Sequence, residues 1–584
     1  MRKLALFLIL STIAQAANKR AANSAGLRFE ISFPKEQSAT PLDGHVLLLI
    51  SNNNDKEPRF QLSYNATESQ QMFGVDVDAL APGTPAIIDH TTLGYPAESL
   101  ADIPAGDYWV QGAINIYETF HLGNGHTVKL PPDKGEGQHW QVKPGNLISK
   151  PEKIHIDPKS SQTIKISLTE KIPAVDEEPK VVDMFAGWDF SNDDHKVADN
   201  KWVKHITIKS DVLTNFWGRP TSIGAVILLP DGWDEHPDAH YPLIVEQDHF
   251  HRGMPGIIAL RTTPPGDSLK GNELGAAKRG YKLYQDWTAG RLPRVIVMTI
   301  QHATPYFDDS YAVNSENDGP YGDAITRELI PYIEKEYRGI GQGWARSVYG
   351  GSTGGWESLA SQVFYPDFYN GAWVFCPDVV DFRAYVTANL YEDKNAYFID
   401  APYTRVARPS MRQPDGLVQA TMEQMNRYEL VQGTHGRSGE QFDIWESVFS
   451  PVGDDGYPKR IFDKRTGKID PEVAKYWKEH YDLSAIIQRD WKTLGPKLAG
   501  KLHFWVGEAD TFYLDRAVHL LKDFLESTTD PYYHGTFDFG MRKPHCYAGD
   551  VDAAVGLNQH YWPEMVKHME ATAPPGADVR SWKY

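Results

Sequence analysis

A change in hydrophobic pattern near residue 200 limits the folds open to this chain. After Lys201, extended apolar runs alternate with helical stretches, which is the pattern of βαβ units around a parallel sheet. We expect strands at 222–229, 242–247, 294–300, 346–350, 371–375 and 502–506, and helices at 321–337, 355–365 and 514–527. The pattern of residues 201–584 therefore predicts an α/β domain.

The residues before this point have a different pattern. Residues 27–172 contain short runs with a period of two, separated by turns rich in Pro, Gly and Asn, and no long amphipathic helix. This pattern predicts an N-terminal all-β, sandwich-like domain. Residues 173–200 are acidic and lack steady periodicity, so we interpret them as a linker. A chain of 584 residues is long enough for more than one domain.

The N-terminus has the features of an export signal. Arg2 and Lys3 precede a short apolar run, and Ala14-Gln15-Ala16 fits the small-x-small cleavage rule. We therefore expect a signal peptide at residues 1–16 and a periplasmic or secreted protein. The run is too short to span a membrane, and we expect no membrane span elsewhere. The net charge of −18 argues against nucleic acid and against anionic membrane surfaces as partners.

A nucleophile motif lies inside the predicted α/β domain. Gly350-Gly351-Ser352-Thr353-Gly354 is a G-x-S-x-G sequence between a short β run and a predicted helix. In an α/β-hydrolase this elbow holds the nucleophilic serine on a strained turn at the N-terminus of a helix. The motif alone is common, but its strand–helix context predicts Ser352 as a catalytic nucleophile.

A catalytic serine needs a base and an acid that orients the base, in the chain order Ser, Asp or Glu, His. Asp510 follows the predicted strand 502–506, and we expect it to be the acid; Glu508 and Asp515 are its rivals. His545 lies in a later loop, and we expect it to be the base. His534 and His560 are the rival histidines.

Other expectations follow from this placement. The oxyanion hole needs two backbone N–H groups, for which we expect Thr353 and, from the loop after the strand 242–247, Phe250. An insertion at about 381–500 follows the strand after the nucleophile, a position that suits a cap over an active site. Export permits a disulfide between Cys376 and Cys546, the only two cysteines.

Histidines at 236, 240, 249 and 251 are close together in the sequence. They lie in loops and show neither an H-E-x-x-H motif nor a Cys/His pairing. We therefore expect cleft and loop histidines with no metal site. Acyl transfer through a triad needs no cofactor, and we expect none.

Several passages in the same order resemble the esterase D family of α/β-hydrolases. This family includes feruloyl, acetyl-xylan and enterochelin esterases, S-formylglutathione hydrolases and mycolyl transferases. The resemblance spans about 201–545 without the insertion, and its passages are 228–233 (LLPDGW), 319–338, 347–360 and 365–372 (YPDFYNGA).

By this resemblance Ser352 is the nucleophile, Asp510 the acid and His545 the base, with amides of Thr353 and the Phe250 region in the oxyanion hole. The chain departs from the family at Gly351, where a histidine is usual. It also departs at Asp248-His249, where the family usually has His-Gly.

The sequence thus predicts an exported serine esterase acting on a small-molecule or polymer-borne ester, which includes carbohydrate-linked esters. Three alternatives stay open. An acyltransferase or a serine peptidase would use the same fold and triad, and a non-catalytic binding protein would keep the fold alone.

Overall fold

The structure, a computed structural model, describes residues 26–174, 199–250, 260–266, 268–551 and 557–584. The predicted signal peptide at 1–16 and most of the predicted linker at 173–200 lie outside these residues. The chain divides into two compact units. The first comprises the chain up to Tyr117, Gly145–Ile172 and Val431–Thr434; the second comprises Glu118–Pro144, Pro173–Leu430 and His435–Tyr584.

The first unit is built of β-strands in two sheets. One sheet has the order β10 (Thr163–Ser167), β1 (Arg28–Ser32), β4 (Ala86–Ile88). The other has the order β11 (Glu170–Lys171), β8 (Leu147–Ile148), β6 (Gly106–His121), β2 (Leu42–Ser51), β3 (Gln71–Leu80), β5 (Gly94–Tyr95). A further strand, β9 (Glu152–Ile156), also pairs with β6. The end of β6 from Glu118 and its partner β7 (Thr127–Leu130) belong to the second unit.

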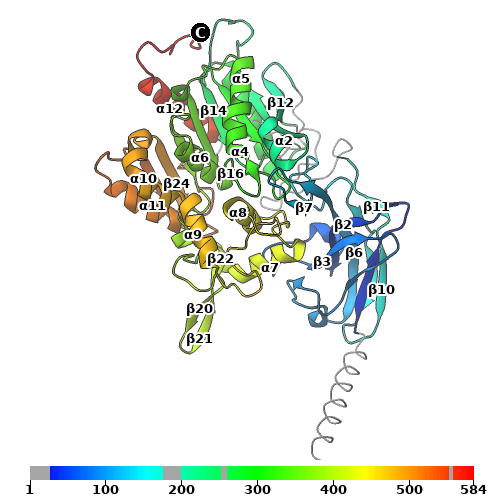
Figure 1. The fold of residues 1–584 in the computed structure, drawn as a ribbon. Helices are drawn as coiled ribbons and strands as arrows, with labels where there is room; N and C mark the ends of the chain where they lie inside the picture. Colours follow the sequence, from blue (N-terminus) through cyan, green and yellow to red (C-terminus); the bar gives the residue numbers. More distant parts are fainter. Residues whose placement is uncertain (1–25, 175–198, 251–259, 267, 552–556) are drawn as a thin grey trace, which may run out of the picture. The chain divides into compact units, whose positions relative to one another are not determined.

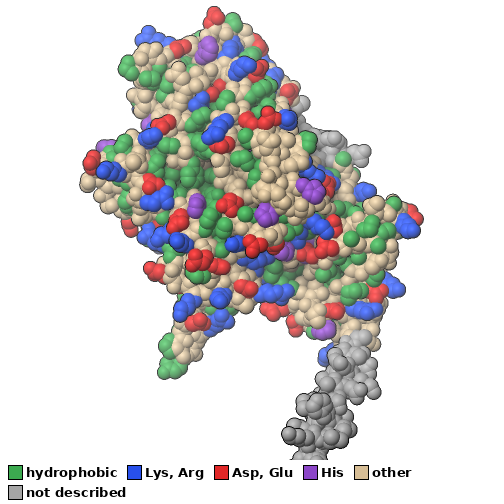
Figure 2. Space-filling view, in the orientation of Figure 1, with side chains coloured by type: hydrophobic (Ala, Val, Ile, Leu, Met, Phe, Trp, Pro, Cys, Tyr) green, Lys and Arg blue, Asp and Glu red, His purple; other side chains and the backbone are tan. Residues whose placement is uncertain are grey.

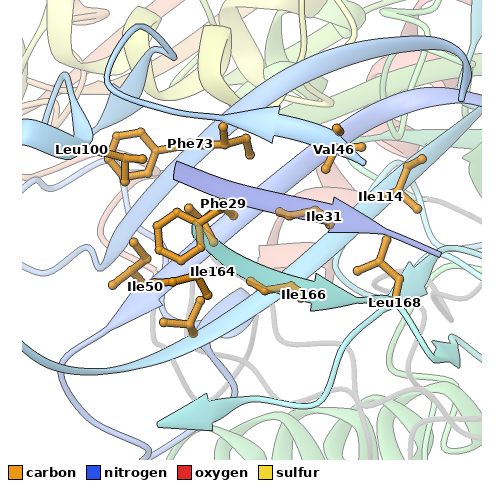
Figure 3. Packing of buried hydrophobic residues seen from close by; sticks show 14 of the residues in the cluster. Phe29, Ile31, Val46, Ile50, Phe73, Leu100, Ile114, Ile164, Ile166 and Leu168 are labelled. Carbon is orange, nitrogen blue, oxygen red and sulfur yellow. The ribbon is translucent and has the colours of Figure 1, made fainter. Parts of the chain in front are cut away.

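The core of this unit forms because alternate residues of each strand point to the same side. Phe29 and Ile31 of β1 are buried in a cluster with residues of both sheets, including Val46 of β2 and Ile114 of β6 (Figure 3). Burying each such side chain contributes about 1.5–3 kcal/mol. The two-residue period in the sequence thus arises because alternate side chains of these strands are buried in a core between two sheets.

The second unit contains the central sheet. Among the described residues its order is β12 (Val203–Ser210), β13 (Thr221–Leu228), β15 (Ile296–Gln301), β14 (Leu243–Gln247), β18 (Arg346–Gly351), β19 (Ala372–Phe375), β24 (Leu502–Gly507), β25 (Thr536–Gly540). Only β12–β13 and β13–β15 pair antiparallel. From β15 to β25 all neighbours are parallel, so their carboxyl ends lie along one edge.

Helices lie against this sheet (Figure 1). They are α2 (Asp211–Trp217), α3 (Gly271–Thr288), α4 (Tyr321–Asp323), α5 (Ile330–Glu336), α6 (Thr353–Phe364), α11 (Asp515–Ser527) and α12 (Leu557–Thr572). A π-helical segment, Ala324–Leu329, joins α4 to α5, so the helix predicted at 321–337 is present with an irregular middle. Trp287 of α3 and Trp562 of α12 are buried against strand residues such as Ile244. The helix α6 packs against β14, β18 and β19.

Residues between β19 and β24 form the insertion. It contains two hairpins, β20 (Phe398–Ala401) with β21 (Thr404–Ala407) and β22 (Pro409–Arg412) with β23 (Val418–Thr421). Its helices are α7 (Met422–Gln432), α8 (Gln441–Phe449), α9 (Pro471–His480) and α10 (Leu483–Leu498). A further small hairpin, β16 (Asn314–Ser315) with β17 (Gly319–Pro320), precedes α4. Within the described residues no strand of the insertion joins the central sheet, as expected from the sequence.

The surface carries charges of both signs. On the face in Figure 2, acidic and basic side chains are interspersed, without one continuous basic patch. In the part of the chain that the structure describes, no helix is both long and apolar enough to cross a membrane.

Candidate active site

Ser352 occupies a strained turn between β18 and α6. Its φ is 57° and its ψ −121°, a region that residues other than glycine rarely adopt. Two backbone hydrogen bonds hold the turn: the Ser352 N–H donates to the carbonyl oxygen of Phe375 (3.0 Å), and the Asp378 N–H donates to that of Ser352 (3.1 Å). The strand–turn–helix context predicted for Ser352 is therefore present.

The outer glycines of the motif are required by a neighbouring strand. A Cβ at Gly350 would lie 2.4 Å from the carbonyl oxygen of Gln247 at the end of β14, and one at Gly354 would lie 1.9 Å from it. Both distances are far below any contact that a Cβ makes with backbone. Only glycine lets β14 approach the elbow this closely.

Ser352, His545 and Asp510 form one chain of hydrogen bonds. The His545 Nε2 lies 2.8 Å from the Ser352 Oγ, and its Nδ1 lies 2.7 Å from the Asp510 Oδ2. Asp510 is fully buried in a turn after β24, and its Oδ1 accepts the N–H groups of Phe512 (2.9 Å) and Leu514 (3.3 Å). His545 follows β25. The ends of three strands thus bring together residues that are far apart in the sequence.

The rival residues lie elsewhere. Glu508 is exposed, and Asp515 accepts a hydrogen bond from Arg412 (3.1 Å). His560 is exposed and lies 4.0 Å from Glu564 on its own helix. His534 precedes β25 rather than following it.

Charges around His545 affect its protonation. Burial by itself lowers the pKa of His545, but the negative charges of Cys546 in its thiolate form and of the Asp510 carboxylate raise this pKa well above its ordinary value. The pKa of Cys546 is lowered, first by a hydrogen bond with Cys376, against the opposing effect of burial, and then by the His545 charge. The base of the candidate triad is thus coupled to a thiol.

The expected disulfide is not formed. Cys376 and Cys546 are both free cysteines in the structure. Their sulfur atoms and a His545 nitrogen lie within 4.8 Å of one another, whereas a disulfide joins sulfurs at about 2.05 Å. The pair is close, as the sequence indicated, but it is a pair of thiols.

The two residues expected at the oxyanion hole differ in whether their backbone N–H group is already hydrogen-bonded. Thr353 is the first residue of α6, where an N–H group has no partner within the helix. The N–H of Phe250, in contrast, donates to the carbonyl oxygen of Asp248 (2.9 Å). A role for Phe250 as an oxyanion donor therefore requires that this hydrogen bond opens. Residues 251–253 of the same loop lie outside the described residues.

A buried polar cluster lies beside Thr353, and no sequence motif points to it. The Thr353 hydroxyl and the Tyr311 hydroxyl both donate to the Asp378 Oδ2 (2.8 and 2.6 Å), and Trp445 of α8 donates to the Tyr311 oxygen (2.6 Å). Gln441 of α8 donates to Asp378 as well (3.1 Å). Burial raises the pKa of Asp378, opposed by the hydrogen bonds from Tyr311 and Thr353. The cluster connects the insertion to the first turn of α6.

Arg412 of β22 holds the loop that carries Asp510. Its guanidinium donates to the carbonyl oxygens of Asp510 (2.9 Å) and Glu508 (3.3 Å), and its backbone N–H donates to that of Thr511 (2.8 Å). No local motif marks this arginine in the sequence, because its partners are about a hundred residues away.

Among the described residues, two groups of side chains have the geometry to hold a metal ion. One is Cys376, His545 and Cys546, which includes the base of the candidate triad. The other is His249, Asp308 and Asp309. Of the other histidines considered for zinc, His236 stacks on Tyr584 at 3.4 Å between ring centres, and His251 lies outside the described residues.

Comparison with known proteins relates part of the chain to a family. Residues 220–445 match the family model described as "Putative esterase". A search of curated proteins found no match.

Solved structures similar to the chain include a ferulic acid esterase, with 14% identity, 63% of this chain and 100% of that chain covered, and a TM-score of 0.34. They also include an S-formylglutathione hydrolase from Agrobacterium tumefaciens (10% identity, 63% and 94% covered, TM-score 0.30). A third is FphF, a fluorophosphonate-binding serine hydrolase from Staphylococcus aureus (12% identity, 63% and 98% covered, TM-score 0.31).

The family match spans β13 to α8, including the elbow at Ser352. It confirms the resemblance to the esterases and the α/β-hydrolase fold. Residues 220–445 thus match this esterase family, which supports a carboxylic ester hydrolase.

Proposed function

We propose that the chain is an exported esterase that cleaves its substrate with a triad of Ser352, His545 and Asp510. The observation that carries the proposal is the continuous chain of hydrogen bonds from Ser352 through His545 to buried Asp510 (2.8 and 2.7 Å). Nucleophile, base and orienting acid stand in the order that acyl transfer requires.

The reaction follows from this geometry. The neutral imidazole of His545 accepts the Ser352 proton at Nε2 while the Ser352 Oγ attacks the ester carbonyl. Its Nδ1–H donates to Asp510, which fixes the tautomer and stabilises the imidazolium that forms. His545 then protonates the leaving alcohol. Water, deprotonated by His545, hydrolyses the acyl-enzyme and returns Ser352 to its starting state.

The oxyanion of the tetrahedral intermediate needs donors next to Ser352. The Thr353 N–H is one donor, and the N-terminal end of α6 favours the negative charge. We propose the amide of Phe250 as the second donor, after its hydrogen bond to Asp248 opens during catalysis. The hydroxyl of Thr353 is held by Asp378, which keeps this first helical turn in place.

We assign roles to the insertion, the N-terminal region and the linker from their positions in the chain. Residues 381–500 form a cap, supported by Arg412 on the Asp510 loop and by Trp445 of α8 on Tyr311. Residues 27–172, apart from Glu118–Pro144, form a separate β-domain. Residues 173–200 link it to the catalytic domain at 201–584, and residues 1–16 direct export.

Replacing the nucleophile tests the proposal. Ser352→Ala should lower kcat for p-nitrophenyl acetate by about 10⁴- to 10⁶-fold, while Ser527→Ala, at an exposed serine that ends α11, should leave it unchanged. Retained hydrolysis by Ser352→Ala would rule out Ser352 as the nucleophile.

The same protein separates the alternatives. Assayed with an added alcohol acceptor and with an amide analogue, an esterase should release mainly free acid and leave the amide intact. A panel of acetyl, feruloyl and longer acyl esters then identifies the acyl group of the small-molecule or carbohydrate-borne substrate.

A further inference from the structure

A second cluster of ionisable side chains lies beside the loop that follows β14. The Nδ1 atom of His249 lies 3.0 Å from the Asp308 Oδ1 and 2.9 Å from the Asp309 Oδ2. The three ligand atoms lie within 4.8 Å of one another. Asp308 and Asp309 come from the segment after β15, so the cluster joins two loops at the carboxyl edge of the sheet.

Glu357 of α6 lies beside Asp309 of this cluster and comes from a third segment. Its side chain is fully buried, and among the described residues no N–H or O–H group donates to either carboxyl oxygen. Instead the carboxyl group faces that of Asp309. Burial and then the Asp309 charge raise the pKa of Glu357 well above its ordinary value. Two facing carboxyl groups must share either a proton or a cation.

The His302 ring lies next to the Glu357 carboxyl group. Its Nδ1 accepts the backbone N–H of Ser310 (3.1 Å), which leaves the ring proton on Nε2. That Nε2 lies 3.7 Å from the Glu357 Oε1 and is buried without another partner among the described residues. This distance is longer than a hydrogen bond, but a small movement of either side chain would let Nε2–H donate to Glu357, as second donors commonly do to carboxylates that bind metals.

The charge balance also favours a cation. In the described part of the chain, no lysine or arginine pairs with Asp309 or Glu357, and both are fully buried. Buried carboxylates are costly unless a proton or a positive charge offsets them, and His249 and His302 are the basic groups that lie beside these two among the described residues. His249, which supplies the imidazole, contributes at most one positive charge.

We propose that His249, Asp308 and Asp309 bind a divalent transition-metal ion, with the Glu357 carboxyl group beside Asp309 as a further ligand and His302 placed to donate to Glu357. One imidazole nitrogen and several carboxylate oxygens suit Mn²⁺, Zn²⁺ or a related ion, whereas Ca²⁺ takes oxygen ligands alone. The ion would tie the loop before Phe250 to the helix that starts after Ser352. The site is separate from the triad, so it stands or falls independently of the proposed hydrolytic mechanism.

Manganese is the probe, because it prefers oxygen and imidazole ligands to the thiols of Cys376 and Cys546. The full chain is stripped with EDTA, and bound Mn²⁺ is counted by electron paramagnetic resonance during titration. We expect one Mn²⁺ per chain, and at least a ~10-fold lower affinity in Asp309→Asn and Glu357→Gln. Asp400→Asn, at an exposed aspartate of β20, should bind as the unmodified protein does.

Two results would overturn the proposal. One is no binding by the folded protein up to about 1 mM Mn²⁺, which would leave a cluster that shares protons. The other is binding unchanged in both cluster variants, which would place the ion elsewhere. Should these variants fail to fold, the electron spin echo of Mn²⁺ bound to His545→Gln, which lacks the imidazole of the other group, decides. A ¹⁴N coupling from imidazole supports the site, and its absence refutes it.

Discussion

Replacing Asp510 by asparagine separates the charge of the proposed acid from its shape. The Oδ1 atom accepts the N–H groups of Phe512 (2.9 Å) and Leu514 (3.3 Å), and an asparagine oxygen can keep both bonds. The amide NH₂ then takes the place of Oδ2, 2.7 Å from the His545 Nδ1. A donor at that position forces His545 into the tautomer with its proton on Nε2, which cannot accept the Ser352 proton.

The magnitude follows from the loss of the correct tautomer. An equivalent change in a well-studied serine protease lowers kcat about 10⁴-fold, and four tenfold steps correspond to about 5.4 kcal/mol in the activation barrier. We expect a loss of this order for Asp510→Asn, with KM for p-nitrophenyl acetate nearly unchanged because the residue is buried away from bulk solvent. Stopped-flow or steady-state hydrolysis measures both constants.

The rival acid supplies the matched control. Glu508→Gln removes the charge of an exposed carboxylate in the same loop and should keep kcat within about twofold. Circular dichroism checks that both variants are folded. Full activity in Asp510→Asn, or an equal loss in Glu508→Gln, would refute the assignment of the acid.

Three further predictions concern the base, the elbow and the insertion. Because the pKa of His545 is raised and only its neutral form is a base, kcat/KM should fall as the pH drops through a midpoint above the ordinary value of about 6.5. Cys546→Ser should move this midpoint to lower pH, and an unmoved midpoint would contradict an effect of Cys546 on the pKa of His545. Gly354→Ala places a Cβ 1.9 Å from the Gln247 carbonyl oxygen, so it should abolish soluble expression or activity, and an active variant would contradict the close approach of β14 to the elbow. Arg412→Ala should lower kcat about 10- to 100-fold by loosening the acid loop, with partial rescue by Arg412→Lys; equal kcat in all three proteins would show that this contact has no catalytic role.

The raised pKa of His545 also has a consequence for stability. A group whose pKa is higher in the folded than in the unfolded state contributes stability at pH values below its unfolded pKa. That contribution is lost as the pH rises through the folded pKa. The free energy of unfolding of His545→Gln should therefore approach that of the unmodified protein as the pH rises, which urea titration at several pH values measures.

The positions proposed for the triad could be predicted from the sequence because each follows the end of a strand. Parallel strands place their carboxyl ends along one edge, so Ser352 after β18, Asp510 after β24 and His545 after β25 meet without any knowledge of side-chain contacts. The glycines of the elbow indicate the same turn. These signals are local, and local patterns can be read from one sequence.

Contacts between the insertion and the rest of the α/β domain could not be predicted in this way. Arg412 on the acid loop and Trp445 on Tyr311 depend on how residues 381–500 fold back onto the sheet. Glu357 lies inside a regular helix, where a glutamate usually faces solvent, and its partners Asp308 and Asp309 lie in another loop. The cysteines were correctly placed together, but pairing depends on a distance of a few ångströms that no pattern reports.

Labelling with a fluorophosphonate tests the central claim most directly, because the reagent reacts only with a serine activated in a folded site. Intact-mass and peptide mass spectrometry of the treated protein should show one adduct, on Ser352, and none in Ser352→Ala. We predict that His545→Gln, which keeps Ser352 but removes its base, also stays unlabelled. An adduct on another serine, or no adduct in a protein that hydrolyses esters, would contradict the proposed triad.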